Sequence, residues 1–285
     1  MSVAINIKVN DGVVLAADTA TTVAQAVQGG QQPTVMNIYN NANKVFNLLK
    51  GQPIGMISWG AGGIVSASIA TLAKDLRHRF ADGEESWRLD VRGYTMEQVA
   101  GLVRRFMFEE QYTEAFKEVE ASDRPPLGFV VAGYSANAAI AEEYKITIER
   151  GDCPEPELIR KPGEVGITWN GQGEAIIRLV AGFSGRLPQV LTGTFDDDLA
   201  RRVFDTVRGS LQAPLVHPAM PIQDAVDLAD FLVDATIKFY KYLPGAPSVG
   251  GPIEIAAITK HEGFKWIRRK HYYSRELNPE LGGQR

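Results

Sequence analysis

Residues 2–19 read SVAINIKVNDGVVLAADT, and this stretch decides how the fold begins. Apolar side chains alternate with polar or small ones over residues 3–9, and the turn-forming residues Asn10-Asp11-Gly12 separate them from a second apolar run at 13–17. Alternation with a period of two on either side of a turn is typical of a β-hairpin. We therefore expect two paired strands, with Ser2 directly before the first.

The length of the hairpin loop decides which side chains share a face. A three-residue loop closed by Gly12 pairs Val9 with Val13 and places Ser2 and Asp18 on one face. A two-residue Asp11-Gly12 turn places these two side chains on opposite faces, because a shift of one residue reverses every side chain. A functional Ser2/Asp18 pair thus predicts the longer loop.

The composition excludes several classes of protein. The 285 residues are 45% hydrophobic and 22% charged, with a net charge of -4, which is ordinary for globular domains. The basic clusters at 77–79 and 268–270 are short and are interpreted as solvated surface, so we expect no nucleic-acid partner. The apolar runs are too short to cross a membrane and no signal peptide precedes Ser2, so we expect no membrane association and a cytoplasmic location.

The sequence indicates neither a metal nor a cofactor. The 4 histidines are scattered, without the spacing of metal ligands. The single cysteine, Cys153, can form no internal disulfide and has no histidine near it in the sequence. The glycines near 60–63 and 171–173 do not match phosphate-loop or dinucleotide-binding motifs.

The order of expected elements indicates a single domain over residues 1–285 with a polar tail at 274–285. Apolar patterning predicts strands at 3–9, 13–17, 44–49, 54–58, 127–133, 140–149, 175–182, 253–259 and 264–268, and helices at 64–80, 95–119, 196–211 and 221–242. Thr95 is the expected N-cap of the second helix, with Gln98 three positions further on. The fold class is therefore mixed α/β (α+β).

Three segments resemble the first third of a proteasome β-type subunit. They are residues 12–19 (GVVLAADT), 43–46 (NKVF) and 55–61 (GMISWGA), and the later segment 248–251 (SVGG) is similar to the Ser-Gly-Gly of that family. Proteasome β-type subunits belong to the N-terminal-nucleophile (Ntn) hydrolases. The resemblance implies a four-layer α/β/β/α sandwich and a bacterial proteasome-like peptidase.

The resemblance also implies a catalytic set. Laying the Gly-Val-Val-x-Ala-Ala-Asp segment on this chain without gaps puts the N-terminal nucleophile at Ser2, which removal of Met1 would expose. A free α-amine has a pKa of about 7.7–8.0 and can accept the proton of its own hydroxyl. Lys44 would lower the pKa of that amine, and Asp18 would hold Lys44 in place. Most relatives carry threonine rather than serine.

Further residues follow from the same likeness. Backbone N–H groups of the turn Trp59-Gly60-Ala61 would stabilise the oxyanion, although the family usually has glycine where Trp59 stands. Ser248 matches the later supporting serine. Thr22 would lie on the strand that pairs with an extended substrate, and Ala42, Ile57 and Ala61 would line a mostly apolar first pocket.

The partners implied are a peptide or unfolded protein as substrate and further copies of the chain, assembled into rings or a helical stack. Whether an ATP-dependent unfoldase also takes part stays open. Two other functions remain as alternatives. One is a small-amide acylase on the same fold, and the other is a catalytically silent assembly or scaffold protein.

Overall fold

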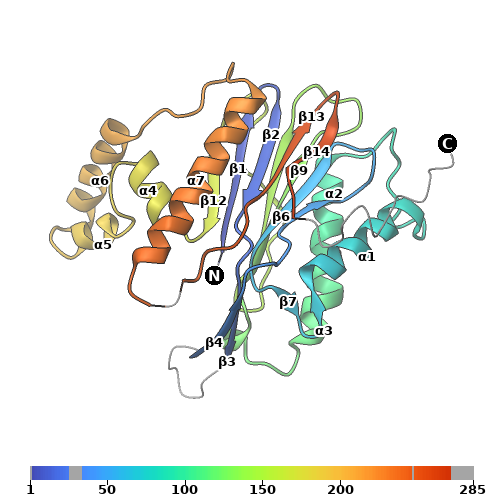
Figure 1. Ribbon diagram of the computed structural model, residues 1–285, viewed down its shortest axis with the longest axis horizontal. Helices are drawn as coiled ribbons and strands as arrows, with labels where there is room; N and C mark the ends of the chain where they lie inside the picture. The colour runs from blue at the N-terminus through green and yellow to red at the C-terminus, as the bar shows by residue number, and fades with distance from the viewer. Residues whose placement is uncertain (1, 26–33, 246, 271–285) are drawn as a thin grey trace.

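The computed structural model describes residues 2–25, 34–245 and 247–270. Two five-stranded sheets, in which every pair of neighbouring strands is antiparallel, form its centre (Figure 1). The first has the order β12-β1-β2-β13-β14, with β12 at Gly166–Gly171, β1 at Val3–Val9, β2 at Gly12–Ala17, β13 at Glu254–Thr259 and β14 at Gly263–Arg268. The second has the order β11-β10-β9-β6-β5, with β11 at Glu157–Leu158, β10 at Glu142–Ile148, β9 at Leu127–Gly133, β6 at Ile54–Gly60 and β5 at Val45–Asn47.

Helices lie on both sides of the paired sheets (Figure 1). One group comprises α4 (Glu174–Val180), α5 (Leu187–Thr192), α6 (Asp197–Leu211) and α7 (Ile222–Tyr242). The other comprises α1 (Ile69–Asp82), α2 (Met96–Arg104), a π-helix at Arg105–Tyr112 and α3 (Thr113–Ala115), followed by a short 3-10 helix at Ala121–Asp123. Two small hairpins complete the described elements, β3 (Thr21–Gln25) with β4 (Thr34–Tyr39) and β7 (Gly63–Ile64) with β8 (Ala67–Ser68).

Alternation along β1 and its neighbours distributes apolar side chains over separate cores. Val3, Ile5 and Ile7 pack with side chains of α7, whereas Ala4 shares a cluster with Ile57 of β6 between the two sheets. A third cluster joins the other face of the second sheet to α1 and α2. Since successive side chains of a strand point to opposite faces, β1 is buried on both sides along its whole length.

Much of the expected element order is confirmed. The fold is a mixed α/β (α+β) one with antiparallel sheets, and the strand at 127–133 and the helices near 196–211 and 221–242 lie where the sequence predicts them. Thr95 is the N-cap of α2, and its side chain accepts from the N–H of Gln98 at 3.1 Å. The helix expected over 95–119 ends earlier and passes through the π-helix, because the i+4 ladder widens after Arg104.

Two other predictions about elements are wrong. Residues 175–182, expected as a strand, belong mostly to α4, and the neighbouring strand of this sheet is the preceding segment, β12. A short apolar run such as AIIRLV has no periodicity that separates a strand from a buried helix. The helix expected at 64–80 begins at Ile69, because residues 63–68 form the β7–β8 hairpin and Ser68 caps the helix by accepting from the N–H of Thr71.

The hairpin register also differs from the predicted one. Val9 pairs with Gly12 and Ala4 with Ala17, so the loop is Asn10-Asp11, which is neither the three-residue loop nor the Asp11-Gly12 turn. The three-residue loop would have paired Val9 with Val13, which instead faces Lys8. The tail at 274–285 lies outside the described residues, as does Met1.

Candidate active site

Asp18, which follows the last residue of β2, is at the centre of the site and is fully buried. Its Oδ1 accepts from the N–H of Val3 at 3.0 Å and from Nζ of Lys44 at 2.6 Å. Its Oδ2 accepts from the N–H of Gly250 at 3.0 Å and of Ala20 at 3.2 Å. Four donors from separate segments thus hold one carboxylate, which fixes its orientation and stabilises its negative charge.

Lys44 lies directly before β5 and is 6% exposed. Burial lowers the pKa of Lys44, because taking an ammonium out of water disfavours the charged form, and the adjacent Asp18 carboxylate opposes that shift. The backbone N–H of Lys44 donates to Oε2 of the buried Glu254 at 3.1 Å. Both ends of this residue are therefore held, the side chain by Asp18 and the backbone by the first residue of β13.

Ser2 stands immediately before β1 and is 3% exposed. Its carbonyl oxygen accepts from the N–H of Gln172 at 2.7 Å. Gly171 has φ +81° and lies so close that a Cβ there would collide with that same carbonyl oxygen. Ser2 is linked to the buried pair through its neighbour, since the N–H of Val3 and the ammonium of Lys44 meet on one oxygen of Asp18.

The link between Ser2 and Asp18 corrects the argument made from the loop length. The shorter loop does not separate the two residues, because Asp18 lies beyond the last paired residue of β2 and reaches a backbone N–H instead of facing the Ser2 side chain across the hairpin. Side-chain alternation describes only residues inside the strand ladder. A strand-end residue can thus serve a site that the register alone would exclude.

The end of β6 lies beside Ser2, because Trp59 and Gly60, expected in a turn, are the last two residues of this strand. Trp59, Gly60 and Ser2 line a cavity of about 230 Å³. Gly60 has φ +90°, and a Cβ there would collide with the carbonyl oxygen of Pro126. The N–H of Ala61 is already used, because it donates to that carbonyl oxygen at 3.0 Å. The indole of Trp59 lies over Gly128 on β9, where only glycine leaves room for the ring.

The loop before β13 brings Ser248 to the site. Ser248 is 3% exposed. Two residues further on, Gly250 donates to Asp18, and its carbonyl oxygen accepts from the N–H of Thr19 at 3.0 Å. Thr19 Oγ1 donates to carbonyl oxygens of Asn40 and Pro252 at 2.8 and 2.7 Å. The segment that carries Ser248 is therefore bonded directly to the end of β2.

The residues expected to line a substrate pocket do not share one location. Ala42 lines a cavity next to Lys44, whereas Ile57 is fully buried between the two sheets and does not line the cavity beside Ser2. Ala61 packs against the core under α1 and α2. Thr22 lies on β3 opposite Ile38 of β4, with its hydroxyl oxygen buried and without a hydrogen-bond partner among the described residues.

Sequence reasoning missed Glu254 and Lys270. Glu254 binds the N–H of Lys44, and Lys270 Nζ donates to the carbonyl oxygen of Ala42 and lies 3.9 Å from Glu254. The cluster at 268–270 is thus not only solvated surface. A glutamate at the start of the apolar run 253–259 is a signal that could have identified a buried charge, since such a residue is rarely buried without partners.

The part of the chain that the structure describes has no group of three or more His, Cys, Asp or Glu side chains arranged to hold a metal ion. Within the same ranges, no helix combines the length and the apolar character needed to span a membrane.

Comparison with known proteins supports the fold. No family model matches the chain, and no curated protein matches it. Among 261 matching chains of solved structures is an Anbu (Gly-1) mutant from Hyphomicrobium sp. strain MC1. The match covers 95% of this chain and 86% of that one, with a TM-score of 0.51 and 15% sequence identity.

At this level of identity the likeness concerns the fold. The chain therefore has a mixed α/β fold similar to that of Anbu.

Proposed function

We propose that this protein is a proteasome-like peptidase that hydrolyses peptide bonds with Ser2 as an N-terminal nucleophile. In this proposal the chain is one domain with the four-layer α/β/β/α sandwich of the Ntn hydrolases. The observation that carries it is the buried Asp18–Lys44 pair, joined at 2.6 Å and hydrogen-bonded to the N–H of Val3 beside Ser2. The structural likeness to Anbu gives independent support.

The chemistry requires that Met1 is removed, so that Ser2 carries a free α-amine. The Ser2 hydroxyl attacks the scissile carbonyl carbon, and its proton passes to the α-amine. Lys44 acts as a nearby cation that disfavours protonation of the amine and so keeps it able to accept that proton. When the carbon–nitrogen bond breaks, the amine returns the proton to the leaving group. Water then hydrolyses the serine ester.

Negative charge that develops on the substrate oxygen needs preorganised donors. We assign this role to the end of β6 at Trp59 and Gly60, which lines the cavity beside Ser2. The N–H of Ala61 is engaged with Pro126 and is not assigned to the oxyanion. Ser248 supports the site through its loop, which binds Asp18.

Self-association completes the proposal. Rings or a helical stack of copies would enclose the sites and restrict them to peptides and unfolded chains. The location proposed is the cytoplasm, and an ATP-dependent unfoldase would supply unfolded substrate to such an assembly.

Intact-mass measurement with an acylating probe tests the function. The full chain is produced without an N-terminal tag and incubated with a β-lactone, and the adduct is mapped by fragmentation. We expect loss of Met1 and a single adduct on Ser2, absent from Ser2→Ala. The exposed residue Ser66 supplies a matched control, because Ser66→Ala should be labelled like the unmodified sequence.

Three other outcomes would contradict the proposal. A retained Met1, or a free Ser2 that stays unlabelled while a threonine-type control enzyme reacts, would favour a silent assembly protein. A labelled Ser2 with hydrolysis of simple acyl amides, but not of extended peptides, would favour the small-amide acylase.

A further inference from the structure

Two adjoining cavities lie on the Lys44 side of the candidate site. One has a volume of about 690 Å³ and the other about 70 Å³. They share the lining residues Asn43, Ala70, Lys74 and Arg269, and we call the two together the basic groove. The larger one falls in the range of about 300–1,000 Å³ that is typical of ligand sites.

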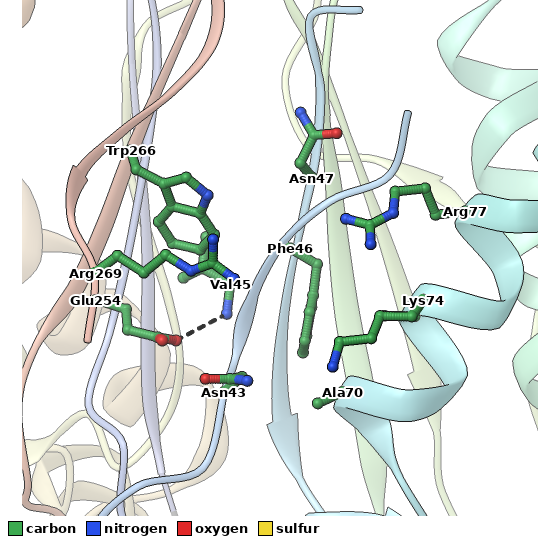
Figure 2. A pocket seen from close by; sticks show the side chains of 11 residues that line it. Asn43, Val45, Phe46, Asn47, Ala70, Lys74, Arg77, Glu254, Trp266 and Arg269 are labelled. Carbon is green, nitrogen blue, oxygen red and sulfur yellow. Dashed lines mark hydrogen bonds between the residues drawn. The ribbon is translucent and has the colours of Figure 1, made fainter. Parts of the chain in front are cut away.

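Positive side chains enter the basic groove from opposite sides. Lys74 and Arg77 reach in from α1, and Arg269 reaches toward them from the segment after β14, as Figure 2 shows. The guanidinium of Arg269 lies 4.8 Å from the ring centroid of Trp266, which orients it. Lys270, whose side chain is 9% exposed, adds a further ammonium to the larger cavity.

Little negative charge balances these cations. Glu254 is the lining carboxylate, but its Oε2 already accepts from the N–H groups of Lys44 and Val45, the second of which is drawn in Figure 2. The Oε1 atom of Glu254 lies 3.9 Å from Nζ of Lys270. Within the described parts of the chain, no carboxylate lies within 4.0 Å of Lys74, Arg77 or Arg269. Like charges gathered in one groove repel, and an anion bound between them relieves that repulsion.

The basic groove adjoins the proposed chemistry. Ala42 and Asn43, which line it, directly precede Lys44 in the chain. Thr21, the first residue of β3, lines it from another side. A peptide extended alongside β3 would therefore place a side chain near Lys74 and Arg269.

We infer that the basic groove binds the side-chain carboxylate of an aspartate or glutamate in a peptide substrate. Guanidinium and ammonium groups form their strongest hydrogen bonds with carboxylates, and arginine can offer two parallel donors. This replaces the mostly apolar pocket expected around Ala42. Turnover of such a peptide rests on the proposed function, but its binding does not.

Binding and cleavage can be measured separately on the full chain. For binding, a fluorescent peptide containing one glutamate and its glutamine counterpart are titrated against the Ser2→Ala protein, with anisotropy as the readout. For cleavage, the same pair with a fluorogenic leaving group is compared by kcat/KM. We expect the glutamate peptide to be favoured by about tenfold or more in both, which corresponds to ~1.4 kcal/mol.

The variant Lys74→Met/Arg269→Met should reduce this preference to less than about threefold, and raising the salt concentration should weaken glutamate-peptide binding alone. Both residues are exposed, so the variant is expected to fold. The matched control is Lys50→Met/Arg201→Met, which changes two exposed cations that line neither cavity and should keep the full preference.

Equal binding of the two peptides, or a preference that survives loss of Lys74 and Arg269, would overturn the inference. Failure of the proposed function gives a different result from failure of this inference. If the proposed function fails, no peptide is cleaved and Ser2 takes no β-lactone adduct, but the anisotropy titration still reports whether the basic groove selects a carboxylate.

Discussion

Replacing Asp18 by asparagine tests whether the buried pair is as tightly coupled as its geometry indicates. The substitution keeps the size of the side chain and removes the negative charge opposite Lys44, which is 6% exposed. The amide nitrogen also replaces one of the two accepting oxygens, so its hydrogens oppose either the donors of Val3 and Lys44 or the N–H groups of Ala20 and Gly250. We expect Asp18→Asn to lower the free energy of unfolding by about 3–5 kcal/mol, the usual cost of leaving one member of a buried ion pair without its partner.

The measurement is urea unfolding followed by tryptophan fluorescence, for the unmodified chain and for three variants. These are Asp18→Asn, Lys44→Met, and the double variant that combines them and so removes the unpaired cation. The double substitution should cost at least about 1 kcal/mol less than the sum of the two single ones, because residues in direct contact are coupled by about 0.5–3 kcal/mol. A loss below about 1 kcal/mol for Asp18→Asn, or strict additivity in the double variant, would refute the reasoning.

Three more predictions concern neighbouring parts of the molecule. Gly171→Ala should lower both the free energy of unfolding and the rate of Ser2 labelling, since its Cβ collides with the Ser2 carbonyl oxygen. The control Gly51→Ala, at a similar φ of +79° in open space, should show only the smaller cost of the backbone conformation, and equal effects of the two variants would contradict this. Burial lowers the pKa of Lys270 to about 8, below the 10.5 of an unfolded lysine. Between these two pH values the unfolded state binds more protons, so the free energy of unfolding should rise with pH in the unmodified chain relative to Lys270→Met. A difference between the two proteins that stays constant with pH in urea unfolding would contradict this. Ile57→Ala should lower the free energy of unfolding by about 2–5 kcal/mol without changing glutamate-peptide binding, because this side chain fills the core between the sheets. A change in peptide selectivity would instead assign Ile57 to the substrate pocket.

Long amphipathic segments were the most predictable part of this fold. The helices at Asp197–Leu211 and Ile222–Tyr242 carry periodic apolar residues over many turns, so their positions follow from the sequence alone. The six-residue run in α4 does not, since only its packing against α7 decides between strand and helix. The register of the β1–β2 hairpin depends on one residue of loop length, which the Asn-Asp-Gly signal leaves open.

The candidate site divides in the same way. Asp18 and Lys44 were predictable because they stand in a recognisable order in the first 50 residues. Glu254 and Lys270 were not, because their roles depend on contacts with Lys44 and Ala42 that span more than two hundred residues. The charge of the basic groove likewise arises only when α1 and the segment after β14 come together, and no local pattern predicts that meeting.

The contacts of Asp18 bear on when the site forms during synthesis. The carboxylate lies at the end of β2, but one of its donors is Gly250, and one of the two neighbours of β2 in the sheet is β13. A nascent chain that ends before residue 250 therefore has β2 with one unpaired edge, and its Asp18 carboxylate lacks one of its four donors. Contacts between residues this distant in sequence form late in folding, because closing the long intervening loop costs conformational entropy. If the proposed function is correct, an unfinished copy is inert at this site until β13 has paired with β2.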